Sequence, residues 1–248
     1  MHQWSIGNID AAYRYLSWSN SAIQSDPAGR DQAPLRHDLQ LLSPVMLAMM
    51  TALHGDVDGS RAMLDALEAA AGDDPYSITV WSAFSVTVAT LVGDPPWALR
   101  AAERGIAQDP EFSFAFLGAY QRLARCWARA VTAGDPSAAA AAEEIIVLTL
   151  LDPPRSNLAT WYGLLGEMWL AAGRLDEAGA ALDRADSFVA DYGERYAEGL
   201  LILLRARLMR AQGEPAADVR AMAERARSLS TERGAYLFAR RAEELLSD

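Results

Sequence analysis

The chain has 248 residues, of which 51% are hydrophobic and 22% are charged, and its formal net charge is −11. Such an acidic surface repels phosphate backbones, so we expect no direct contact with nucleic acid. The single cysteine, Cys126, excludes an internal disulfide and favours a reducing, cytoplasmic location. No run of about 18 uninterrupted apolar residues is present, so we expect no membrane span.

A glycine returns about every 40 residues, at Gly55, Gly93, Gly134, Gly173 and Gly213. Each of these glycines ends an apolar run with helical character, and four of the five are followed by Asp or Glu. A glycine that closes one helix, followed by an acidic residue that caps the next, is a turn between paired helices. The period indicates an all-α repeat protein: a right-handed superhelical solenoid of about six helix-turn-helix hairpins, in one domain over 1–248.

In chain order, the pattern predicts helices over 8–21, 36–54, 57–71, 75–92, 95–108, 110–133, 136–151, 157–172, 175–190, 194–212, 215–230 and 233–246. Pro44 is expected to split or kink the second of these. The stretch 145–151 also reads as a buried strand, although its helical neighbours favour a helix. Six Asp-Pro pairs, at 26–27, 74–75, 94–95, 109–110, 135–136 and 152–153, are read as helix starts, with Asp as the cap.

Two further positions repeat within the units. Five residues after the glycine stands a small side chain, which allows two helices to approach closely, and nine residues after it stands a second packing residue. The first set is Ser60, Ala98, Ala139 and Ala178, and the second is Leu64, Ala102, Leu182 and Met222. Gly7 begins one more such turn, so the chain opens in the middle of a repeat, and we expect it to be a fragment of a longer protein.

One unit resembles a tetratricopeptide repeat, because a set of residues stands at that family's characteristic spacing. The set is Tyr162, Leu165, Gly166, Trp169, Ala178, Leu182 and Ala185. In the preceding unit Trp127 takes the place of Gly166, and in the following unit Arg205-Ala206 replaces Leu165-Gly166.

The segments 196–200, 204–208 and 211–214 are similar to the longer C-terminal repeats of bacterial signalling ATPases. That group includes LuxR-type and antibiotic-regulator-type transcription factors and ATPase-linked nucleotide cyclases. The resemblance implies an attached ATPase module and a DNA-binding or cyclase module in a parent protein. Neither module is in this sequence, which has no lysine with which to build a phosphate-binding Gly-x-x-x-x-Gly-Lys loop.

Catalytic signals are weak. The histidines His2, His37 and His54 form no metal-binding pair, and we expect no metal and no cofactor. Cys126 lies in an apolar helical stretch, which favours a buried, inert thiol. His54 is interpreted as a residue at a helix C-terminus, where positive charge is favourable.

By analogy with tetratricopeptide arrays, the first helix of each pair lines a concave groove. The candidate binding residues are Gln121, Trp161, Tyr162, Glu167, Arg207 and Arg210. The two arginines are suited to a carboxylate, although a solvated face with partners such as Glu198 is the competing interpretation. Most aromatic residues of the middle region are expected to be core.

The leading hypothesis is a non-catalytic regulatory module that binds a protein partner or a small effector in the groove. The first alternative is self-association or scaffolding, for instance as a homodimer. An all-helical enzyme is the second alternative, and it has the least support because no carboxylate cluster or activated nucleophile is visible.

Overall fold

The computed structural model describes residues 2–247 except 26–33, 110, 112–113 and 154–155. The described part is 83% helical and contains no strand, as the glycine period predicts. The helices are α1 (His2–Ser5), α2 (Ile9–Ser25), α3 (Pro34–Leu53), α4 (Val57–Ala71), α5 (Pro75–Val92), α6 (Pro95–Gln108), α7 (Ala115–Ala133), α8 (Pro136–Thr149), α9 (Leu158–Ala171), α10 (Leu175–Tyr192), α11 (Glu198–Ala211), α12 (Ala216–Glu232) and α13 (Tyr236–Ser247).

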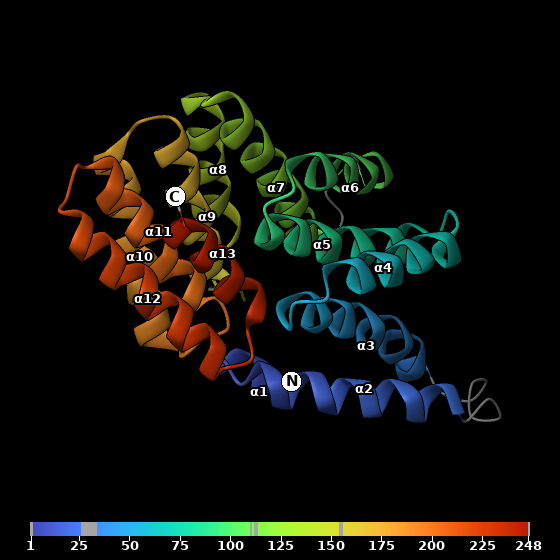
Figure 1. Ribbon diagram of the computed structural model, residues 1–248. Coiled ribbons are helices and arrows are strands. Elements are labelled where there is room, and N and C mark those ends of the chain that lie inside the picture. Colours follow the sequence, from blue (N-terminus) through green and yellow to red (C-terminus); the bar gives the residue numbers. More distant parts are fainter. Residues whose placement is uncertain (1, 26–33, 110, 112–113, 154–155, 248) are drawn as a thin grey trace.

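The helices pack in neighbouring pairs (Figure 1). The odd-numbered helices from α3 to α13 form a continuous row, in which each contacts the next odd-numbered helix. Each even-numbered helix from α4 to α12 covers the two odd-numbered helices that flank it in sequence. This order is consistent with a helical repeat, and it places the first helix of every pair in one layer.

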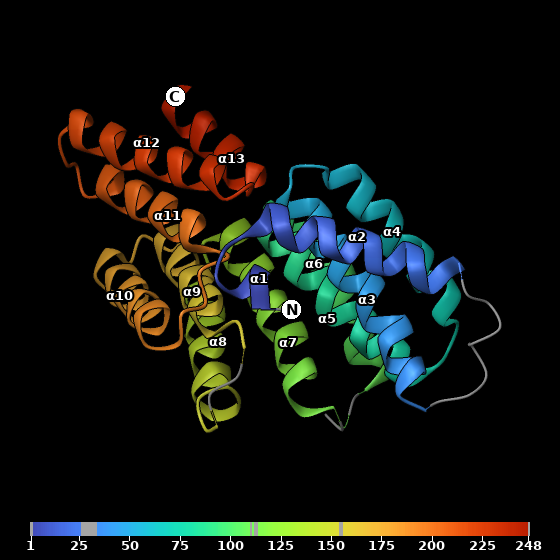
Figure 2. The same cartoon turned by 90° about the horizontal axis from the view of Figure 1, so that it is seen from below.

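The two ends of the row contact each other. Helix α13 packs against α3, although most of the chain separates them. The backbone N–H of Ile9 donates to the carbonyl of Arg233 at 3.0 Å, and the N–H of Arg195 donates to the carbonyl of Ser5 at 2.5 Å. Figure 2 shows α1 beside the beginning of α11. These contacts join the N-terminal helices to the C-terminal part of the chain.

The turn chemistry confirms the predicted hairpin boundaries. All five recurring glycines have positive φ, and Gly93 closes α5 in the left-handed conformation with its N–H bonded to the carbonyl of Ala89 at 3.0 Å. The carboxylates of Asp56, Asp94 and Asp135 each accept a backbone N–H of the following helix at 2.9 Å. The turns at Gly55, Gly93 and Gly134 are therefore specified locally by two adjacent residues, whereas α10 and α12 begin without a side-chain cap.

Three of the six Asp-Pro pairs begin helices, namely those at 74–75, 94–95 and 135–136. The expected starts at Pro110 and near Pro153 are wrong, since α7 begins at Ala115 and α9 at Leu158. Asp109 is buried and its Oδ2 accepts the N–H of Phe114 at 3.0 Å, so this carboxylate closes a loop instead of capping a helix. The pair at 26–27 lies outside the described residues.

The close-packing positions behave as predicted. Ser60, Ala98, Ala139 and Ala178 are all completely buried where paired helices cross. Among the second set, Leu64, Ala102 and Leu182 are buried, while Met222 is partly buried against the same core. Small side chains at the crossings allow the backbones to approach, and the larger ones fill the space beside them.

Two local alternatives are resolved by the structure. The apolar stretch 145–151 is helical as far as Thr149, where α8 ends, so the helical interpretation is confirmed for 145–149 and the last two residues lie beyond the helix. Pro44 lies inside α3, so the prediction that it splits this helix in two is wrong. Within the part of the chain that the structure describes, only α5 is long and apolar enough to cross a membrane, and 72% of it is buried inside the fold.

Candidate functional site

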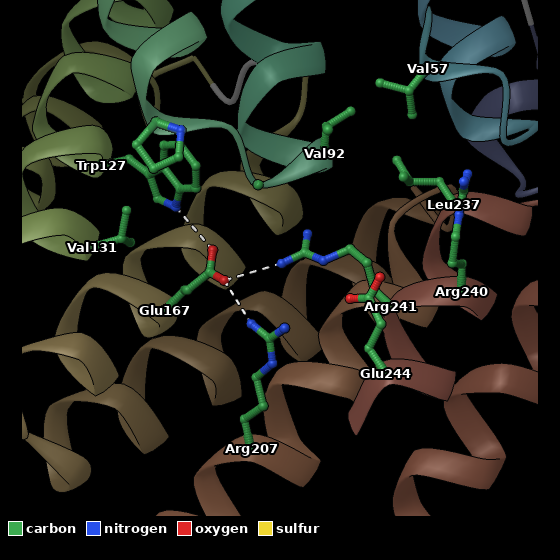
Figure 3. A pocket seen from close by; sticks show the side chains of 12 residues that line it. Val57, Val92, Trp127, Val131, Glu167, Arg207, Leu237, Arg240, Arg241 and Glu244 are labelled. Atoms are coloured by element: carbon green, nitrogen blue, oxygen red, sulfur yellow. Dashed lines mark hydrogen bonds and ion pairs between the residues drawn. The ribbon is translucent and has the colours of Figure 1, made fainter. Parts of the chain in front are cut away.

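A pocket of about 490 Å³ opens where the C-terminal parts of α5, α7, α9 and α11 meet α13 (Figure 3). Its walls come from α7, α9, α11 and α13, from the first residues of α4 and α6, and from the end of α5 with the turn that follows it. We call it the central pocket. Its apolar side includes Val57, Val92, Val131 and Leu237, and its charged side consists of three arginines and two glutamates.

Glu167, on α9, is the centre of the charged side. Its Oε1 accepts bonds from Nη1 of Arg207 at 3.0 Å and from Nη2 of Arg241 at 3.3 Å. Its Oε2 accepts the indole N–H of Trp127 at 2.9 Å. Only 12% of the Glu167 side chain is exposed, so these three donors replace nearly all of its water (Figure 3).

The register of the repeats explains this convergence. Trp127 and Arg207 each lie 40 residues from Glu167, one repeat before it and one repeat after it. Equivalent positions on successive first helices point in the same direction and stack along the inner layer. An acidic residue at this position therefore meets the side chains of both neighbouring repeats.

Arg241 comes from the last helix and completes the cluster. Its side chain is 9% exposed, and its Nη1 donates to the carbonyl of Leu91 at 2.6 Å, near the C-terminal end of α5. Burial lowers the pKa of Arg241, while the carboxylates of Glu167 and Glu244 act in the opposite direction. The guanidinium keeps its charge, because its pKa is far above neutral pH in proteins.

Arg240 and Glu244 lie on the same helix at the edge of the pocket. Nη2 of Arg240 donates to the carbonyl of Gly55 at 2.7 Å, at the turn after α3. Arg240 and Arg241 together thus attach α13 to the ends of α3 and α5. With Arg207 they make three positive charges against two carboxylates, in a protein whose net charge is −11.

The structure brings together two of the six candidate residues, Glu167 and Arg207. Gln121 is buried with its Nε2 bonded to the carbonyl of Thr79 at 3.3 Å, and Trp161 is in the core. Each lies six residues before a pocket residue on its own helix, which turns it about 120° away from the pocket.

Two further candidate residues lie elsewhere. Tyr162 is buried and stacks on Phe188 with ring centroids 5.4 Å apart. Arg210 lines a separate surface hollow between α11, α12 and α13. Glu198, which we considered as an arginine partner, pairs with Arg233 at 2.7 Å instead.

Among the residues of the central pocket that the sequence did not predict, four have charged or hydrogen-bonding side chains: Trp127, Arg240, Arg241 and Glu244. Trp127 was assigned to the place of Gly166, one residue out of the 40-residue register in which it meets Glu167. That spacing is visible in the sequence and would have revealed it. The other three depend on the contact of α13 with α3 and α5, for which the sequence has no local signal.

The other reactive side chains, Cys126 and His54, lie in surroundings that favour a structural role. Cys126 is half-buried, and burial raises the pKa of its thiol, which disfavours the nucleophilic thiolate. His54 follows the last residue of α3, with its Nε2 3.0 Å from Oδ1 of Asp10 and its ring stacked on Tyr13. Among the described residues, no three His, Cys, Asp or Glu side chains are grouped so as to hold a metal ion.

No protein-family model matches the chain, and searches of the curated proteins and of the solved structures likewise find no match.

Proposed function

We propose that the chain is a non-catalytic regulatory module that binds a small effector or a segment of a protein partner in the central pocket. The observation that carries the proposal is the Glu167 cluster. It places the nearly buried charges of α9 and α13, together with the partly exposed Arg207 of α11, beside a cavity with an apolar wall. A concave, partly apolar site with a few oriented polar groups is the usual form of a ligand-binding pocket.

The cost of the cluster supports a role beyond folding. Burying ion pairs requires desolvation, which well-packed apolar side chains would avoid. Arg241 and Glu167 are nevertheless both close to fully buried at the pocket wall. Charges kept at such a position are suited to orienting a ligand.

The position of the pocket suits regulation. Its walls join residues from Val57 to Glu244, so that a ligand there contacts both ends of the row. Binding would favour the arrangement in which α13 contacts α3 and α5. A ligand that stabilises this arrangement would thereby signal its presence to attached modules.

The resemblance to repeats of bacterial signalling ATPases supplies the proposed context. In that context the chain forms a right-handed superhelical solenoid in a cytoplasmic transcriptional regulator or nucleotide cyclase. The central pocket would then control an ATPase module elsewhere in the parent protein. The acidic net charge supports a role without direct nucleic-acid contact.

A pair of valine substitutions tests the proposal. Val131→Trp places a large ring in the central pocket, while Val147→Trp adds the same ring at an exposed position of α8. A calorimetric screen of small acids, bases, sugars and peptides should yield a ligand that binds the wild type and Val147→Trp but not Val131→Trp. A screen with no such ligand contradicts the proposal.

Self-association is the second candidate function, favoured by an exposed aromatic face on α2. Tyr15 is 66% exposed and Trp18 is 72% exposed, beside an apolar hollow that includes Leu16 and Met46. Exposed apolar patches of this kind mark contacts between proteins. Light scattering should show a dimer that Trp18→Ser dissociates, and a concentration-independent monomer excludes this candidate.

A further inference from the structure

We infer that the ligand of the central pocket carries a carboxylate on an apolar body, with the carboxylate bound between Arg207 and Arg241. The inference rests on the proposed function and specifies its ligand class. It follows from the balance of charge, from the hydrogen-bonding capacity of the arginines and from the shape of the pocket.

The charge balance favours an anion. Three guanidinium groups and two carboxylates line the pocket, which leaves one positive charge in excess. Arg207 and Arg241 donate to the same oxygen of Glu167, so two cations share one carboxylate. Burial is the main cause that lowers the pKa of Arg241, and the positive charge of Arg207 acts in the same direction. A second carboxylate would relieve this repulsion.

The arginines also have donors to spare. A guanidinium carries five N–H groups in a planar fork that matches the two oxygens of a carboxylate. Arg207 uses one of them on Glu167; its side chain is 28% exposed, and it lines the pocket. Figure 3 shows its guanidinium directed at Glu167 from below, beside the side chain of Arg241.

The volume of the central pocket and its apolar side chains indicate the rest of the ligand. A volume of about 490 Å³ is far larger than a bare oxoanion needs and lies in the range of pockets for drug-sized ligands. Val92 and Val131 face the arginines across it, and Leu237 adds an apolar side chain beside Arg240 on α13 (Figure 3). A carboxylate joined to an aliphatic or aromatic body fills both parts. A free organic acid and the C-terminus of a peptide with an apolar last residue share this chemistry.

Calorimetric titration with chosen probes tests the inference. Octanoate and 4-phenylbutyrate represent free acids, n-octylamine is the cationic counterpart, and inorganic phosphate is the bare oxoanion. A pentapeptide ending in Leu, with its C-terminus free or amidated, represents a chain end. We expect the apolar carboxylates to bind at least about tenfold more tightly than the amine or phosphate.

Two substitutions that remove charges of opposite sign from the pocket give a sharper test. Arg207→Gln should weaken octanoate binding about tenfold, while Glu244→Gln should strengthen it about threefold because it removes a competing negative charge. The matched controls are Arg205→Gln, whose arginine pairs with Asp183 and Asp186 outside the pocket, and Glu243→Gln on the same helix as Glu244. Both controls should leave the affinity within about twofold.

Each outcome decides a separate point. Tighter binding of n-octylamine, tighter binding of phosphate, or no change on Arg207→Gln overturns the carboxylate assignment. Binding of the free peptide but not of the amidated one supports the assignment and identifies a chain end as the source, whereas equal binding of the two peptides counts against it. A ligand of other chemistry that Val131→Trp excludes would overturn this inference and leave the proposed function standing. If no ligand is found whose binding Val131→Trp abolishes, both the carboxylate assignment and the proposed function fail.

Discussion

Removal of the Glu167 carboxylate should destabilise the fold more than removal of any exposed acidic residue. Glu167→Ala deletes the acceptor of three hydrogen bonds, two of which come from guanidinium groups. Arg207 is 28% exposed and regains water, whereas Arg241 is 9% exposed and loses its nearest carboxylate inside the fold. A buried charge without its partner and an unpaired indole N–H together cost about 3 kcal/mol of unfolding free energy.

Urea denaturation measures this loss, and Asp183→Ala is the matched control. Asp183 also pairs with an arginine, at 2.6 Å from Arg205, but its side chain is 73% exposed. An exposed pair contributes under about 1 kcal/mol, and Arg205 keeps its bond to Asp186. We expect Glu167→Gln to fall between the two, because the amide oxygen still accepts one bond. A loss below about 1 kcal/mol for Glu167→Ala would refute the view that this carboxylate holds α9, α11 and α13 together.

Two further predictions concern packing and pH. Ala139→Leu should lower the free energy of unfolding by about 1 to 3 kcal/mol, because it overpacks a fully buried helix crossing. Ala140→Leu, on the exposed side of α8, should change it by less than about 0.5 kcal/mol. Thermal unfolding of the two variants measures the difference. Burial raises the pKa of Glu194 above the ordinary value of 4.5, although the N–H of Asn157 opposes this. The folded state therefore binds the proton more tightly, and the wild type loses stability relative to Glu194→Gln as the pH rises from about 4.5 through the raised pKa. Urea titrations across this range should show the difference between the two proteins growing with pH and then levelling, and a difference independent of pH contradicts the assignment.

Local signals made the helical hairpins predictable. The turn after α5 needs only Gly93 in a left-handed conformation and Asp94 as the next cap, and both properties are fixed by residue type. The prediction that Asp109 caps a helix was wrong, because its carboxylate accepts the backbone N–H of Phe114 across a loop. An Asp-Pro pair indicates a helix start, but tertiary contacts decide whether the helix forms there.

The candidate site was predictable only where it follows the repeat. Glu167 and Arg207 lie 40 residues apart, so their meeting could be inferred from the period. Arg241 reaches Glu167 because α13 packs against the other end of the row, a contact between distant segments that leaves no periodic trace. Trp161 was chosen as a groove aromatic, but large apolar rings are commonly buried and its place on α9 turns it into the core.

A crystal structure of the protein, determined from crystals grown with octanoate, most directly tests the claim that the central pocket binds an apolar carboxylate. The account predicts octanoate in the central pocket, with its carboxylate about 2.7 to 2.9 Å from the guanidinium nitrogens of Arg207 and Arg241. It also predicts Arg241 bonded to Glu167 and α13 packed on α3. An empty pocket with octanoate bound elsewhere, or α13 detached from α3, would contradict it.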